Sequence, residues 1–124
     1  MEGKGEWKET AEKVVRKVMF RLWEKGEEPL WVKVNARLVG MGFRYRVVPR
    51  TGLKVVVSPE FKKAFRRLKR RWEKEVRRRE LVKELVETAI AYGDKEVAKK
   101  LLKDCEPYLF TEEIKAYQTK LKNL

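Results

Sequence analysis

The residues in this chain best suited to chemistry are its cations, and many of them gather in one short segment. Residues 62–79 hold 11 lysines and arginines but only two acids, while the whole chain carries a formal net charge of +13. On a helix such like charges repel one another at positions four residues apart, so a partner of opposite charge is expected. Phosphate groups suit such an array well, because cations that bind a nucleic acid release its condensed counterions.

Few residues in the chain are suited to catalysis. The chain has no histidine and a single cysteine, Cys105, so it lacks the usual general base, the common zinc-binding sets and any internal disulfide. Glu73 and Glu75 stand two residues apart on a predicted helix and point in different directions, which argues against a shared metal ion. We therefore predict a protein that is not an enzyme and needs no metal or cofactor.

Composition is typical of a folded protein outside the membrane. The 124 residues suffice for about one domain, and no apolar run approaches the roughly 20 residues of a membrane-spanning helix. The first residues lack the apolar segment of a secretion signal, so we expect a cytoplasmic protein. Asn35, Gln118 and Asn123 are the only amide side chains, a scarcity that suggests a thermophilic source.

Hydrophobic spacing predicts the elements that position the cations, beginning with an N-terminal helix. Apolar residues recur at helical intervals from Trp7 to Leu22. Gly26 can take the left-handed conformation that ends a helix, and Pro29 prevents continuation. We therefore expect the first helix over residues 6–25.

A sheet is predicted next. Residues 30–38 and 43–48 alternate apolar and polar side chains, and residues 53–57 follow the turn-forming segment Pro49–Gly52. Ser58 and Pro59 then form a strong helix start, and the apolar stripe that follows predicts one long basic helix reaching Ile90. The predicted fold class is α+β, with an N-terminal helix, a three- to four-stranded antiparallel sheet, a long basic helix and a C-terminal helical tail.

The sheet would place cations and one tryptophan on a single open face. If the face carrying Leu30, Val32 and Val34 packs on the helices, Trp31 lies opposite among basic side chains. Tyr45 falls on the core side of its strand unless that strand twists. The predicted nucleic-acid-binding residues are Trp31, Lys33, Asn35, Arg37, Arg44, Tyr45, Arg46 and Lys54 on the sheet, and Lys62, Arg66, Arg67, Arg70 and Arg71 on the helix.

An exposed aromatic among cations favours unpaired bases, since stacking of a base on an aromatic ring is worth about 1–3 kcal/mol. We therefore predict sequence-tolerant binding of single-stranded nucleic acid, DNA before RNA. A duplex-binding regulator and an RNA-binding adaptor subunit remain the alternatives. The basic helix offers no Asn, Gln, Ser or Thr between Lys62 and Arg79, which argues against readout of base edges in the major groove.

The C-terminal helices carry little net charge and clear apolar stripes. Asp94 caps one helix, Pro107 breaks it, and Thr111 begins the last. Two interpretations stand: these helices assemble subunits into a dimer or tetramer, or they fold back to complete one core. We divide the chain into a basic α+β domain (residues 1–80) and an oligomerisation segment (residues 81–124). The predicted oligomerisation residues are Leu85, Ile90, Leu101, Leu102, Ile114, Tyr117 and Leu121.

This order of elements resembles the archaeal ThermoDBP and ThermoDBP-related single-stranded-DNA-binding proteins. The resemblance is architectural and covers a sheet over Leu30–Val57, a helix over Ser58–Ile90 and a tail over Asp94–Leu124, without a diagnostic motif. It implies a multimeric, sequence-tolerant single-strand binder of archaeal origin. The binding residues named above come from the strand pattern alone.

Overall fold

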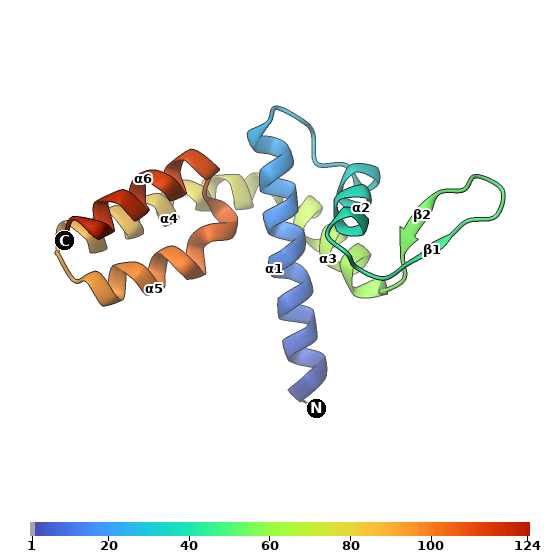
Figure 1. The fold of residues 1–124 in the computed structure, drawn as a ribbon, viewed down its shortest axis with the longest axis horizontal. Coiled ribbons are helices and arrows are strands. Elements are labelled where there is room, and N and C mark those ends of the chain that lie inside the picture. The colour runs from blue at the N-terminus through green and yellow to red at the C-terminus, as the bar shows by residue number, and fades with distance from the viewer. Residues whose placement is uncertain (1) are drawn as a thin grey trace. The chain divides into compact units, whose positions relative to one another are not determined.

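A computed structural model describes the backbone of residues 2–124 and the side chains of residues 10–124, so the side chain of Trp7 lies outside the described part. Over this range the chain forms six α-helices, a short 3-10 helix and one two-stranded sheet (Figure 1). It divides into two compact units, Met1–Arg70 and Arg71–Leu124. That boundary falls before residue 80, where the sequence led us to place it.

The first unit is built on α1 (Glu2–Glu24), which packs against α3 (Pro59–Arg70) and contacts α2 (Trp31–Gly40). The predicted end of the first helix is confirmed, because Gly26 has a φ of +79°. Its conformation lets the amide of Glu27 bond to the carbonyl of Leu22 at 3.0 Å and close the helix. The buried apolar side chains include Val15, Met19 and Phe20 of α1, Val34 and Leu38 of α2, and Phe61, Phe65 and Leu68 of α3.

The strand predicted over residues 30–38 is wrong, because this segment forms α2. Trp31, Val34 and Leu38 share one face at helical spacing, and Val34 and Leu38 are fully buried. The alternating set that suggested a strand is divided by the helix, because Val34 and Leu38 are buried while Leu30, Val32 and Ala36 are exposed, Val32 at 70%. Burial of the helical stripe has outweighed the strand preference of valine, which is a weak guide by itself.

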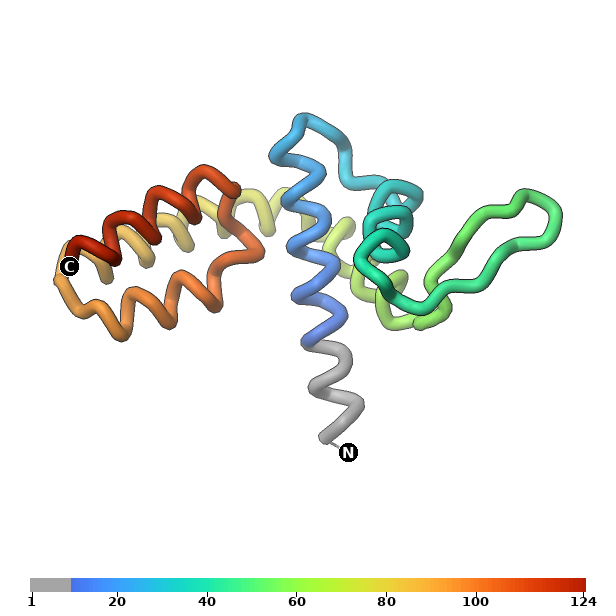
Figure 2. Tube along the Cα trace, in the orientation of Figure 1, coloured from blue at the N-terminus to red at the C-terminus, as the bar shows by residue number. Residues whose placement is uncertain are grey.

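The predicted α+β fold with a three- to four-stranded sheet is therefore corrected to a mostly helical fold with one hairpin. Within the described residues the only sheet pairs β1 (Tyr45–Val47) with β2 (Lys54–Val56) in antiparallel register, Arg46 opposite Val55. The predicted turn between them is confirmed, since Gly52 has a φ of +69° and its amide bonds to the carbonyl of Val48 at 2.8 Å. Figure 2 shows the hairpin loop projecting away from α2 of the same unit.

The single long helix expected from Ser58 to Ile90 is also wrong. The predicted start is confirmed, because α3 begins at Pro59, but the helix stops at Arg70. Arg71 has a φ of −114° and a ψ of 28°, outside the helical range, and α4 (Trp72–Ala91) follows it. The break separates the basic segment into two parts that lie in different units.

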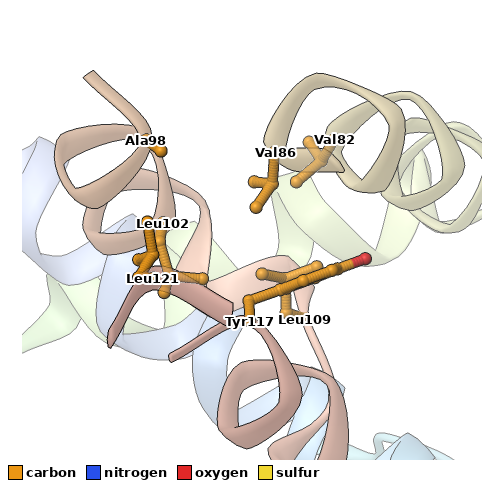
Figure 3. Packing of buried hydrophobic residues seen from close by; sticks show 7 residues of the cluster. All are labelled: Val82, Val86, Ala98, Leu102, Leu109, Tyr117 and Leu121. Atoms are coloured by element: carbon orange, nitrogen blue, oxygen red, sulfur yellow. The ribbon is translucent and has the colours of Figure 1, made fainter. Parts of the chain in front are cut away.

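The second unit is a three-helix bundle of α4, α5 (Lys95–Cys105) and α6 (Thr111–Lys122), with a short 3-10 helix, η1 (Glu106–Tyr108), containing Pro107. The predicted cap of α5 is confirmed, since the Asp94 carboxylate accepts from the amide of Val97 at 3.2 Å. Figure 3 shows its core side chains converging from all three helices. They are Val82, Val86, Ala98, Leu102, Leu109, Tyr117 and Leu121.

Candidate nucleic-acid interface

The β-hairpin is fixed to the first unit at its base. The rings of Phe43 and Phe61 meet edge to face with centroids 4.8 Å apart, which ties the start of the hairpin to α3. Val56 at the end of β2 is buried. The hairpin is therefore anchored where its strands meet the helices, while its loop extends beyond them.

Asn35 completes the anchor from α2. Its amide nitrogen donates to the carbonyl of Lys54 at 2.8 Å, and its amide oxygen accepts from the backbone N–H of Val56 at 3.0 Å. These backbone groups face away from β1, so the side chain occupies the place that a third strand would take. Asn35 is 5% exposed and therefore holds the hairpin rather than meeting a ligand, contrary to our prediction.

The two faces of the hairpin carry different side chains. The antiparallel register places Tyr45 and Lys54 on one face, and the Lys54 ammonium lies 5.2 Å from the centre of the Tyr45 ring. Arg44 and Arg46 lie on the other face, because side chains alternate along a strand. Tyr45 is 43% exposed, which leaves part of its ring open to a planar ligand.

The hairpin cations have no acidic counterpart nearby in the chain. The sequence contains no Asp or Glu between Pro29 and Pro59. Within residues 10–124, no described carboxylate forms an ion pair with the four exposed hairpin cations, Arg44, Arg46, Arg50 and Lys54. We call this set the basic arm. Among the side chains of residues 10–124, no acid balances its charge, so the basic arm carries a local excess of positive charge.

Helix α3 adds a second row of cations. Lys62, Arg66 and Arg70 follow one another at intervals of four residues on its exposed side, and no ion pair joins them to the described side chains. We call these three residues the α3 row. Arg67 lies beside this row but is paired with Glu12 at 3.5 Å, so its charge is partly neutralised.

The structure explains why α3 tolerates its charge. Lys69 contacts Glu28 at 3.4 Å, and Lys63 contacts Glu60 at 3.9 Å. Lys69 meets a carboxylate from the segment that precedes α2, whereas Lys63 meets one from the first turn of α3 itself. Exposed pairs are weak, so they leave these cations available for exchange with phosphate.

Trp31 is not an open stacking platform. It lies on α2, half-buried, with its ring tilted against Phe65 at a centroid distance of 5.6 Å. Lys33 is paired with Glu27 at 3.4 Å, and Arg37 lines a shallow cavity at the junction of α1 and α2. The open sheet face predicted around Trp31 does not exist, because its first strand is a helix.

Comparison with protein-family models, with characterised proteins and with solved structures found no match. The architectural resemblance drawn from the sequence needed a sheet over Leu30–Val57, and the structure replaces that sheet with α2 and a single hairpin. The resemblance therefore loses its structural basis. An interface has to be inferred from the residues of this chain alone.

In the second half of the basic segment, Arg71 and Arg79 are paired with acids of the second unit, whereas Lys74, Arg77 and Arg78 are exposed. Arg71 contacts Glu75 at 3.5 Å, and Glu75 is buried. Arg79 is buried as well, bonds to Glu113 at 2.6 Å and stacks over the Phe110 ring at 3.8 Å. Sequence analysis placed Arg71 at the interface, but its charge is partly neutralised and it belongs to the second unit.

The predicted oligomerisation residues differ in how far they are buried within the second unit. Leu102, Tyr117 and Leu121 are buried in the core of the second unit. Ile90, Leu101 and Ile114 are half-buried, and only Leu85 is more than half exposed, at 54%. Folding back within one chain therefore accounts for most of this stripe.

Arg50 was missed by sequence analysis. It lies at the hairpin tip, between β1 and β2, and is exposed. The acid-free stretch from Pro29 to Pro59 was the signal that could have drawn attention to it. In the described part of the chain, no helix is long and apolar enough to cross a membrane, and no three His, Cys, Asp or Glu side chains are grouped as metal ligands would be.

Proposed function

We propose that this protein binds single-stranded nucleic acid without strong sequence preference, through the basic arm and the α3 row. The observation that carries the proposal is the accumulation of seven exposed cations, within one 70-residue unit, that no described carboxylate neutralises. Met1–Arg70 holds 19 basic and eight acidic residues, whereas Arg71–Leu124 holds 13 and 11. A polyanion is the ligand that such a unit attracts most strongly.

Tyr45 supports single strands as the preferred form. Its partly exposed ring lies between Arg44 and Arg46 in sequence and beside Lys54 in space. A phosphate held by Lys54, which lies on the same face as the ring, would bring neighbouring bases to it, and stacking needs bases that are not paired. Since the ring faces bases through its π surface, the binding would be tolerant of sequence.

A duplex is the second candidate, favoured by the shape of the arm. A two-stranded ribbon fits the width of the major groove, and Arg44 and Arg46 project from one face of it. In that case Arg46 would contact base edges or the flanking phosphates, and Tyr45 would contribute little. The two candidates therefore differ in how much they depend on the tyrosine ring.

The proposal is tested by fluorescence anisotropy with a labelled mixed-sequence single-stranded DNA, the matching RNA and the matching duplex, over a range of salt concentrations. The decisive variant replaces the arm cations: Arg44→Ser, Arg46→Ser, Arg50→Ser and Lys54→Ser combined. We expect affinity for single strands to fall by about two orders of magnitude at low salt, because four phosphate contacts are lost. The slope of log affinity against log salt should fall by up to about 3, at about 0.7 per contact.

A matched control removes the same charge from the second unit through Lys74→Ser, Arg77→Ser, Lys100→Ser and Lys120→Ser. These residues are exposed and lie outside the arm and the α3 row. We expect the salt slope of this control to stay near that of the unmodified protein. Equal losses in the two variants would mean that net charge alone drives binding, and a clear preference for duplex would replace the first candidate with the second.

A further inference from the structure

A groove runs between α5 and α6 on the second unit, and none of the residues that line it belongs to the proposed interface. Its volume is about 810 Å³. The apolar side chains Leu102, Ile114 and Leu121 line it. Leu102 and Leu121 also belong to the core of the bundle, so the floor of the groove is the outer side of a packed interior.

Lysines border this floor from both helices. Lys95, Lys99 and Lys103 follow one another at intervals of four residues on α5, and Lys115 and Lys122 stand on α6. None of the five forms an ion pair with a described side chain. Glu106 is the one acid among the described residues that line the groove. We call these five residues the lysine rim.

We propose that this groove binds an amphipathic helix of a partner protein, with leucine-type residues on one stripe and carboxylates on both flanks. The charge of the lysine rim predicts the residues on the flanks of the partner helix, because five unpaired ammonium groups attract carboxylates. The apolar floor of the groove predicts the leucine-type stripe of the partner helix, because apolar side chains that cover the floor remove apolar surface from water. Two adjacent helices offer ridges between which a third helix can pack.

The dimensions of the rim limit the contact to a short segment. Lys95 and Lys103 are eight residue steps apart on the helix, which is about 12 Å at 1.5 Å per residue. A partner helix of two to three turns covers that distance with about three apolar side chains. Such a short contact gives modest affinity and fast exchange, as expected of an adaptor that joins and leaves a complex.

Nucleic acid fits this groove less well than it fits the arm. Among the described residues that line the groove none is aromatic, so unpaired bases find no ring to stack on. Phosphates bound by the lysines would leave the apolar floor uncovered. The two surfaces therefore suit different ligands, and this proposal stands whether or not the arm binds nucleic acid.

The test uses the full chain and three labelled synthetic peptides of about 15 residues in anisotropy titrations. The first peptide carries leucines at helical spacing with glutamates on both flanks. The second keeps the leucines and replaces the glutamates with lysines, and the third keeps the glutamates and replaces the leucines with serines. We expect the first peptide to bind at least about tenfold more tightly than either of the others, because it alone satisfies both rim and floor.

Paired variants locate the binding. Lys99→Glu with Lys115→Glu reverses two charges of the rim, and Lys100→Glu with Lys120→Glu reverses two charges on the same helices outside the groove. We expect the first pair of substitutions to lower the affinity for the acidic peptide at least about tenfold, and the second pair to lower it less than about threefold. Circular dichroism melting should show that both pairs remain folded.

Four results would overturn the proposal. Equal weakening by both variant pairs would indicate general charge attraction, and equal binding of the serine peptide would show that the floor takes no part. Direct binding of labelled single-stranded DNA that Lys99→Glu with Lys115→Glu weakens at least about tenfold, and Lys100→Glu with Lys120→Glu does not, would assign the groove to nucleic acid. Sedimentation of the unmodified protein as a dimer that the same variant dissociates would make a second copy the occupant.

Discussion

The two halves of the basic segment hold similar numbers of cations, six in residues 62–70 and five in residues 71–79, but these cations have different surroundings. Residues 62–70 lie on α3, and their cations either point to solvent or meet acids of the same unit at its surface. Residues 71–79 begin α4, where Arg71 and Arg79 are paired with Glu75 and Glu113. A run of positive charge in a sequence therefore says little about available charge. What decides it is whether the fold brings carboxylates to the same place.

The largest expected effect is a loss of stability on replacing the buried arginine of α4, compared with an exposed arginine on the same helix. Arg79→Met should lower the free energy of unfolding by about 3 kcal/mol, because it leaves the Glu113 carboxylate in a half-buried site without its shortest ion pair. Lys83 still contacts Glu113 at 3.1 Å and limits the loss. Urea denaturation followed by circular dichroism measures the change.

Arg77→Met is the matched control, since Arg77 lies on the same helix and its side chain is 78% exposed. Its contact with Glu73 at 3.7 Å is a surface pair, so we expect a loss below about 0.5 kcal/mol. Affinity for nucleic acid should remain unchanged in Arg79→Met under conditions where the protein is folded. Similar stability losses for the two variants would show that the burial of Arg79 does not matter.

The next effect tests the anchor of the basic arm. Asn35→Ala should cost about 2 kcal/mol, because it leaves the carbonyl of Lys54 and the N–H of Val56 without their bonds to the side chain. Hydrogen exchange gives a local measurement: the Val56 amide should lose most of its protection. Arg37→Ala on the same helix serves as control, and unchanged protection at Val56 in Asn35→Ala would contradict the assigned role.

Asn35 also shows how far the fold could be predicted. The sequence correctly predicted features that depend on neighbouring residues, such as the helix start at Pro59, the end of α1 at Gly26 and the cap at Asp94. It failed over residues 30–38, where both a strand period and a helix period fit the apolar residues. The choice between them depends on what lies opposite, namely Phe65 and β2, and those contacts are not local.

The surroundings of the cations in the proposed interface were predictable in part for the same reason. The cations of the basic arm and of the α3 row are exposed as expected, and no described carboxylate pairs with them. The burial and pairing of Arg79 could not be predicted from the sequence, since Glu113 lies 34 residues away and only the bundle brings the two side chains together. The prediction that Trp31 is an open stacking platform was wrong for a related reason. A tryptophan near cations in the sequence can also cover the edge of a core, and Trp31 does so by packing on Phe65.

A smaller effect compares the two aromatic side chains proposed for stacking. Tyr45→Ala should weaken binding of single-stranded DNA by about 1 kcal/mol, roughly fivefold, with little loss of stability, because the ring is partly exposed. Trp31→Ala should reduce stability and leave the affinity of the folded protein unchanged, since its ring packs on Phe65. Anisotropy and thermal melting on both variants measure this contrast. Duplex binding that falls as much as single-strand binding in Tyr45→Ala would rule out base stacking.

The smallest effect concerns the acid that neutralises Arg79. Burial alone would raise the pKa of Glu113, but the hydrogen bonds from the Phe110 amide and Lys83 and the charges of Arg79 and Lys83 outweigh it, so the pKa lies below its ordinary value of 4.5. A carboxyl whose pKa is depressed by folding stabilises the protein above its unfolded pKa, and this stability is lost as the pH falls through the folded pKa.

Glu113→Gln should cost roughly 1 kcal/mol or less at pH 7, because the glutamine oxygen can still accept from Arg79 and from the Phe110 amide. The difference from the unmodified protein should shrink as the pH falls below 4.5. Urea denaturation at several pH values between 3 and 7 would measure that difference, with the exposed Glu84→Gln as a control for the loss of a surface carboxylate. A difference that grows as the pH falls would mean that protonated Glu113 is the stabilising form. The second unit would then hold its buried arginine by other contacts, and the contrast between paired and unpaired cations would rest on Arg71 alone.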